Sequence, residues 1–216
     1  MVFSYNEDHI NQNMYINTPF YVILLSCLLV YSYIKQTSFV ISTISLIVVS
    51  IIGYFIHVFS HSFSMTEMLS KQDNYFTRNT NIKPMLDGLC KFMDFHNDVH
   101  HDQEVNKHTR NIIYEAINNF LTQGGILFIL SWLFKHCDPA MFLLWAFIYT
   151  TVHNVNYLFH QPIVHQQHHT NKHSNLGIDL WDIIFNSKYA DDMAVVEDYN
   201  HMSINVIIGI FILCIS

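Results

Sequence analysis

Four long apolar runs constrain the fold of this chain more than any other feature. They cover residues 18–34, 38–61, 118–134 and 139–160. A helix needs about 20 mostly apolar residues to cross the hydrocarbon core of a bilayer. Charged residues make up only 12% of the chain, whereas about a quarter of the residues are charged in a typical soluble domain. The sequence therefore predicts an all-α integral membrane protein.

The connections between these runs predict two transmembrane helical hairpins, or about four spans. Residues 35–37 join the first two runs, and residues 135–138 join the last two. Such short links fit only tight turns, so the polar segments 62–117 and 161–204 are expected on the same side of the membrane. That side carries eight of the ten Lys and Arg residues, and the positive-inside rule therefore assigns it to the cytosol. The histidine-rich segments on this side are expected to form a helical cap.

The same pattern divides the chain into three expected parts. Residues 1–17 form a polar N-terminal segment, and they lack the Lys or Arg residues that a cleaved signal peptide needs. Residues 18–190 form the membrane domain. Residues 191–216 form a C-terminal segment with a short apolar helix, which is expected at the interface or as a re-entrant helix.

Charge and cysteine usage exclude some classes of function. The net charge is −7 and no basic stripe is visible, whereas a nucleic-acid partner requires clustered positive charge. The four cysteines, Cys27, Cys90, Cys137 and Cys214, have no CxxC spacing. They are expected to be reduced thiols and not a disulfide framework or a zinc finger.

Fifteen histidines outnumber the ten Lys and Arg residues, and many of them cluster at the ends of the apolar runs. The clusters are HxxxH (His57, His61), HxxxHH (His96, His100, His101) and HxxHH (His165, His168, His169), with His153 and His160 at the end of the fourth run. A lone helical histidine is more often a hydrogen-bonded core residue than a ligand. Three clusters on one predicted face favour a metal centre, since imidazole is a common metal ligand. Imidazoles without thiolates suit iron or zinc, and eight of them suit two ions sharing one site.

The remaining histidines and the nearby carboxylates have weaker assignments. His9, His108, His136 and His201 lack partners at ligand spacing and are expected not to bind metal, and His173 is expected in an exposed loop. Metal-bound imidazoles usually donate their other N–H to a carboxylate or a carbonyl. Asp98, Asp102, Asp179 and Asp182 are candidates for that role, and simple solvation at the surface is an equally good interpretation of each.

The three histidine boxes around two membrane hairpins resemble those of the fatty acid hydroxylase/sterol desaturase superfamily. The tail "HQQHHTNKHSNLGIDLWDIIFNSKY" is similar to the closing pattern of that family, with Asn175, Leu176 and Gly177 at the turn. Trp181, Asp182 and Phe185 stand at the W-D-x-x-F positions. The resemblance covers about residues 40–190.

This resemblance implies a membrane-bound non-haem di-iron oxygenase that hydroxylates or desaturates an acyl chain or a sterol with O2. It implies two iron ions, for which zinc can substitute in a purified form, and electrons from an external donor such as cytochrome b5. It also implies a location in the endoplasmic reticulum with the boxes facing the cytosol. The implied catalytic and metal residues are His57, His61, His96, His100, His101, His165, His168 and His169, and the metal set also takes in His153 and His160.

The chain departs from the family pattern at the box before the last. Asn156 stands where the family has the first of two histidines, four residues before His160, and His153 lies three residues earlier. On a continuous helix the three would share one face. Because imidazole binds divalent iron better than an amide does, we expect His153 together with His160 to complete the ligand set.

Two interpretations from other classes stand beside the oxygenase. One is a histidine-lined membrane transporter or a metal-binding protein, and the other is a structural membrane protein that has lost catalysis. Transport favours ionisable residues near the middle of the bilayer, whereas the boxes here lie at the ends of the runs. Within the oxygenase interpretation, hydroxylation and desaturation share the same metal chemistry.

Overall fold

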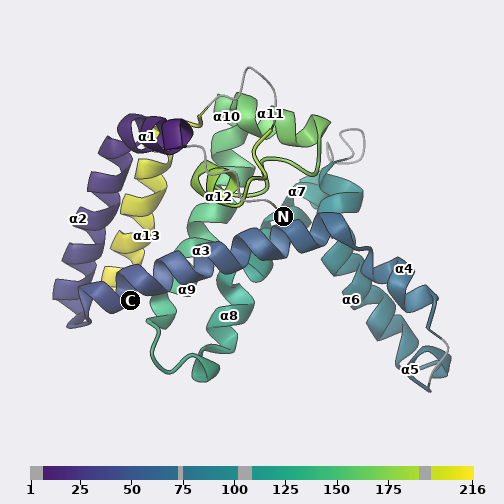
Figure 1. Ribbon diagram of the computed structural model, residues 1–216. Helices are drawn as coiled ribbons and strands as arrows, with labels where there is room; N and C mark the ends of the chain where they lie inside the picture. The colour runs from purple at the N-terminus through teal and green to yellow at the C-terminus, as the bar shows by residue number, and fades with distance from the viewer. Residues whose placement is uncertain (1–6, 73–74, 102–108, 190–195) are drawn as a thin grey trace.

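The structure is a computed structural model, and it describes residues 7–72, 75–101, 109–189 and 196–216 (Figure 1). All regular secondary structure in these ranges is helical, so the prediction of an all-α chain is confirmed. Residues 1–6, Asp102 and His108 lie outside the described ranges, as do residues 190–195 at the predicted domain boundary.

Two described helices are long and apolar enough to cross a membrane, namely α2 (Thr18–Lys35) and α3 (Phe39–Ser62). Pro19 lies in the first turn of α2, where its missing N–H is not needed. The side chain of Ser38 caps α3 by accepting a hydrogen bond from the backbone N–H of Ile41. The short helix α1 (Glu7–Ile16) precedes α2, and α3 crosses α2 steeply (Figure 1).

The third apolar run does not form one straight span. It is divided among α7 (Thr109–Phe120), a π-helical turn (Leu121–Gly125), α8 (Ile126–Ile129) and a 3-10 turn (Ser131–Leu133). The backbone leaves helical geometry at Gly124. A Cβ atom at this position would collide with the carbonyl oxygen of Phe142. The run therefore bends where it packs closely against α9. Two helices among the described residues have spanning length, so the prediction of four spans is not confirmed.

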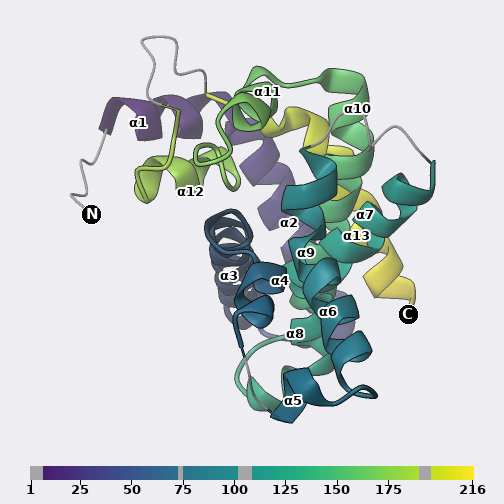
Figure 2. The same ribbon diagram turned by 90° about the vertical axis from the view of Figure 1, so that its right-hand side faces the viewer.

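The fourth run is helical throughout but not uniformly α-helical. It consists of α9 (Pro139–Thr151), a π-helical turn (Val152–Asn156) and α10 (Tyr157–His160). Asp138 caps α9 by accepting from the backbone N–H of Ala140, and it also accepts from the hydroxyl of Ser42 on α3 at 2.6 Å. This contact places the first turns of α3 and α9 together. The two helices cross, and histidines lie at the C-terminal end of each (Figures 1 and 2).

The remaining helices surround this pair. An arm of three helices projects from the end of α3 (Figures 1 and 2): α4 (Met65–Ser70), α5 (Tyr75–Arg78) and α6 (Lys83–Phe95), the last continued by a π-helical turn (His96–His100). The later elements are α11 (Ile163–Thr170), α12 (Asp179–Ile184), a 3-10 turn (Tyr199–Met202) and α13 (Ser203–Ile215). Helix α13 lies beside α2, and the core between α2, α3, α9 and α13 includes Leu28, Val49, Met141 and Val206.

The N-terminal and closing segments are joined by a buried polar network. Asn13 on α1 donates to the carboxylate of Asp179 on α12 and to the hydroxyl of Tyr199, each at 3.2 Å. Asn17 donates to the backbone carbonyl of Glu197 at 2.9 Å. These bonds fix α1 against the segment that carries the last histidine box.

Candidate metal centre

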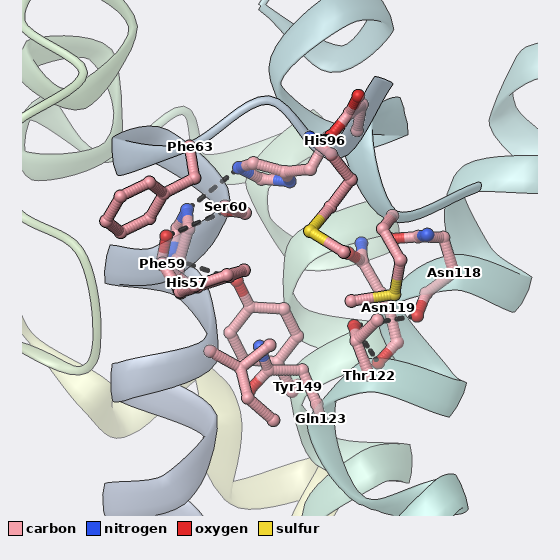
Figure 3. A pocket seen from close by; sticks show the side chains of 14 residues that line it. His57, Phe59, Ser60, Phe63, His96, Asn118, Asn119, Thr122, Gln123 and Tyr149 are labelled. Carbon is pink, nitrogen blue, oxygen red and sulfur yellow. Dashed lines mark hydrogen bonds between the residues drawn. The ribbon is translucent and has the colours of Figure 1, made fainter. Parts of the chain in front are cut away.

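Four buried histidines from three elements form the first histidine group: His57, His61, His96 and His168. The HxxxH spacing puts His57 and His61 on one face of α3, and their Nε2 atoms lie 3.0 Å apart. Nε2 of His57 is also 2.8 Å from Nε2 of His96, which follows α6 (Figure 3). His168 on α11 completes the group, whose candidate ligand atoms lie within 4.8 Å of one another.

A second histidine group lies beside the first and consists of His100, His153, His165 and His169. His100, His165 and His169 offer ligand atoms within 4.8 Å of one another. The ring of His153 lies 4.5 Å from that of His100 and 4.9 Å from that of His165, measured between centroids. His101 lies between the two groups, with its ring centroid 4.7 Å from that of His61 and 4.8 Å from that of His169.

The geometry of both groups fits metal ions better than it fits hydrogen bonding between histidines. Two ring nitrogens can share only one proton, yet Nε2 of His57 has two other Nε2 atoms within 3.0 Å. Ligands bound to one metal at about 2.0–2.1 Å are brought to roughly this separation. Nε2 of His101, His153 and His168 is buried without a hydrogen-bond partner, which is unfavourable unless an ion occupies the space. These buried groups can therefore hold metal.

Burial keeps several of these imidazoles neutral, which is the protonation state that metal binding needs. It lowers the pKa of His96, His165 and His168 well below the usual value, with neighbouring histidines adding to the effect. Burial, followed by the neighbouring His100, lowers the pKa of His169 to about 4. Neutral imidazoles offer a lone pair to a cation without first losing a proton.

The loop after the last box orients His168. Nδ1 of His168 donates to the backbone carbonyl of Ser174 at 2.8 Å, so its proton-free Nε2 points into the first group. Asp182 in turn holds this loop, because its carboxylate accepts from the backbone N–H of Leu176 at 2.7 Å and of Gly177 at 2.9 Å. Burial raises the pKa of Asp182 to about 7.

The described aspartates that were predicted to accept N–H groups from the ligand histidines have other contacts or are exposed. Asp182 anchors the loop, and Asp179 forms a buried ion pair with Lys188. Both are fully buried, so neither is a solvated surface group. Asp98 is exposed, and Asp102 lies outside the described residues.

Glu115 is a candidate site residue that sequence reasoning missed. It lies on α7 and is 4% exposed. Its Oε1 is 2.8 Å from Nδ1 of His100 and 3.2 Å from Nδ1 of His153. Burial raises the pKa of the Glu115 carboxyl, but the contacts with the two histidines outweigh burial and hold the pKa below its usual value. The sequence feature that could have indicated this residue is the spacing of Glu115 and Asn119, which puts two polar side chains on one face of the amphipathic helix α7.

The structure brings His153 to the centre and leaves His160 outside it. His160 is exposed and stacks on His201, with ring centroids 5.1 Å apart. Asn156 donates to the backbone carbonyl of His201 at 2.9 Å and to Oδ1 of Asn205 at 2.8 Å. The π-helical turn explains the difference from the expected shared face, because its extra residue rotates the next helical turn by about 100°.

The histidines expected not to bind metal lie apart from both groups wherever they are described. His136 and His173 are exposed. His201 lies 3.7 Å from Glu197, between Nε2 and Oε1, and His9 is on α1.

Three cavities adjoin the histidines. The largest, about 350 Å³, is mostly apolar, lies between α2, α3 and α9, and reaches His153, Tyr149 and Tyr157. A cavity of about 30 Å³ between the two groups is lined by the same three residues together with His57 and His168. A third of about 20 Å³ lies between His57, His96 and the polar side chains of Asn118, Asn119 and Gln123 (Figure 3). Its volume is close to that needed for one water molecule.

Comparisons of the chain with protein-family models, curated proteins and solved structures gave no match. The buried polyhistidine centre and the apolar cavity beside it are therefore the basis for inferring function.

Proposed function

We propose that the chain is a membrane-bound non-haem di-iron oxygenase that hydroxylates or desaturates a lipid, either an acyl chain or a sterol. The observation that supports this most strongly is the position of the apolar cavity, which runs between α2, α3 and α9 and ends at His153 of the second histidine group. The resemblance of the three histidine boxes to those of lipid hydroxylases and desaturases supports the same proposal.

In this proposal each histidine group holds one ion. His57, His61, His96 and His168 would bind the first, and His100, His153, His165 and His169 would bind the second. Bound iron would supply activation of O2 for attack on a C–H bond. His101, whose ring contacts both groups, lies where it can complete either ligand set.

The apolar cavity would bind the lipid and exclude water from the reaction. Its walls include Leu28, Leu46, Trp145 and Ile148, and apolar surface transferred from water to such walls stabilises binding by about 25 cal/mol per Å². Tyr149 and Tyr157 line both this cavity and the smaller one between the histidine groups. Together with His153 they would set which carbon of the lipid faces the centre.

The reaction requires electrons from outside the chain. Hydroxylation consumes one O2, two electrons and two protons, with one oxygen atom entering the lipid and the other leaving as water. Desaturation takes the same inputs, removes two hydrogen atoms from the lipid and releases two waters. We propose an external carrier such as cytochrome b5 as the donor, at the cytosolic face of the endoplasmic reticulum.

Lipid mass spectrometry of cells that express the chain tests this function. Cells with the wild-type protein should contain a hydroxylated or desaturated lipid that is absent from cells with His168→Ala, provided both proteins reach the membrane in equal amount. Identical lipid profiles would count against the oxygenase.

The same cells also test the transporter interpretation. The middle of α2 and of α3 contains no Asp, Glu, Lys, Arg or His residue, whereas transport sites usually have ionisable groups at that depth. A change in cellular metal uptake without any lipid product would favour transport.

A further inference from the structure

The carboxylate of Glu115 contacts two histidines of the second group through a single oxygen atom. Oε1 lies 2.8 Å from Nδ1 of His100 and 3.2 Å from Nδ1 of His153, and all three side chains are buried. Asn119, one turn further along α7, lies 3.4 Å from Nδ1 of His153 but 3.2 Å from Oδ1 of Asn154. The carboxylate is therefore the closer and the charged partner of His153.

In the rings of His100 and His153, Nε2 is the nitrogen that is available to an ion. Nε2 of His100 and Nε2 of His153 are buried and have no hydrogen-bond partner. If Glu115 and both Nδ1 atoms were ligands of one ion, each Nε2 would carry a proton with no acceptor. If both Nδ1 atoms carry the protons, the carboxylate oxygen of Glu115 lies 2.8 and 3.2 Å from them, and each Nε2 presents a lone pair to an ion.

The two histidine groups consequently differ in what supports them. His168 of the first group donates to the neutral carbonyl of Ser174, whereas His100 and His153 face a carboxylate. A carboxylate that accepts the N–H of a metal-bound imidazole fixes the tautomer and makes the ring a stronger ligand.

We propose that Glu115 is a positioning residue that holds the Nδ1–H form of His100 and His153 and thereby makes the second histidine group the tighter metal site. This inference rests on the metal centre of the proposed function but does not depend on the reaction catalysed. It predicts two ions bound with different affinities, whereas the count of histidines alone suggests two sites of equal affinity.

Metal titration of the purified protein in detergent tests this inference. The metal-free wild type is titrated with Co²⁺ while its visible absorption is followed, and it should bind two ions with different affinities. Glu115→Gln keeps an acceptor oxygen but removes the charge. It should still bind two ions, with the tighter one weakened by about 10–100-fold and its absorption altered. His100→Ala should lose that ion entirely.

A matched variant separates a local effect from general destabilisation. Asp138→Asn changes another buried carboxylate at the opposite end of α9, where it contacts Ser42 and Tyr31, and it should leave both affinities unchanged. If Glu115→Gln fails to fold, Glu115→Asp keeps the charge, and it should bind two ions with only the tighter one weakened.

Three outcomes are distinguishable. Loss of an ion in Glu115→Gln, as in His100→Ala, would show that Glu115 is itself a ligand and overturn the inference. Unchanged affinities in Glu115→Gln would also overturn it. A wild-type protein that binds no ion would contradict the metal centre of the proposed function.

Discussion

Individual histidines in this chain differ in role according to which ring nitrogen is engaged by the protein. Nδ1 of His168 is held by a backbone carbonyl, and Nδ1 of His153 lies near a carboxylate. His160 has an exposed side chain and an aromatic neighbour instead. The role of a histidine is therefore indicated less by its place in a box than by the group that contacts its second ring nitrogen.

Substitutions at the box before the last should separate His153 from its neighbours. His153→Ala should lose about one of two bound ions, because its Nε2 faces the second histidine group. Asn156→Ala and His160→Ala should retain both, since Asn156 bonds to His201 and Asn205 and His160 is exposed. Elemental analysis of the purified variants measures this. Metal loss in Asn156→Ala alone would show that the assignment of His153 is wrong.

Acid should destabilise the metal-free protein. The pKa of His169 is lowered to about 4 in the folded chain, against about 6.5 in an unfolded one. Between these values the unfolded chain binds a proton that the folded chain does not, so stability present above about pH 6.5 is lost as the pH falls toward 4. Thermal unfolding of the metal-free protein across this range measures the loss. His169→Gln should reduce the slope, and an equal slope in that variant would contradict the assignment.

At the scale of elements, π-helical turns and a close glycine contact shape the centre more than helix propensity does. The turn at Val152–Asn156 directs His153 inward, and the turn at His96–His100 begins and ends with a histidine of the two groups. Such turns are rare and are often found at functional positions. Gly124 packs closely against α9, and Glu115 on the preceding α7 lies beside His153.

Gly124→Ala should therefore lower stability. The added Cβ would collide with a backbone carbonyl of Phe142, which cannot move without shifting α9. Overpacking of this kind typically costs about 1–3 kcal/mol, measured by thermal unfolding in detergent. Gly88→Ala on α6 is a matched control, because nothing lies within 4 Å of its new Cβ. It should leave stability unchanged or raise it by about 0.5–1 kcal/mol. Equal melting temperatures for both variants would contradict the packing argument.

For the whole molecule, packing of α3 against α9 brings their histidine-bearing ends together, where the hydroxyl of Tyr149 lies 3.4 Å from Nδ1 of His57. The sequence-based expectation places that end in the cytosol. Ser70 on α4 and Lys135 before α9 are both exposed and lie in segments assigned to opposite sides.

Cysteine labelling should therefore distinguish the two sides. In a variant without its four native cysteines, Ser70→Cys should react with an impermeant reagent only from the cytosol. Lys135→Cys should react only from the other side, because two hairpins return the chain to the same face. The reverse pattern would invert the proposed orientation, and labelling of both from one side would contradict the hairpin scheme.

The sequence by itself determined the helical class of this protein and the local clusters of histidines. Apolar runs of spanning length require helices, and spacings of three and four residues put two rings on one helix face. Both follow from local geometry, which is why the bounds of α2 and α3 lie close to residues 18–34 and 38–61. The third run looked equally long, but its bend depends on how closely α9 packs against Gly124.

Only the tertiary structure decided which histidines meet and what supports them. His57 and His96 are 39 residues apart, and the contacts of Glu115 with His100 and His153 join three separate elements. Helical spacing describes one face of one helix, whereas a metal centre is built where faces of several helices converge. That convergence is set by side-chain packing between elements distant in sequence, and residue spacing does not encode it.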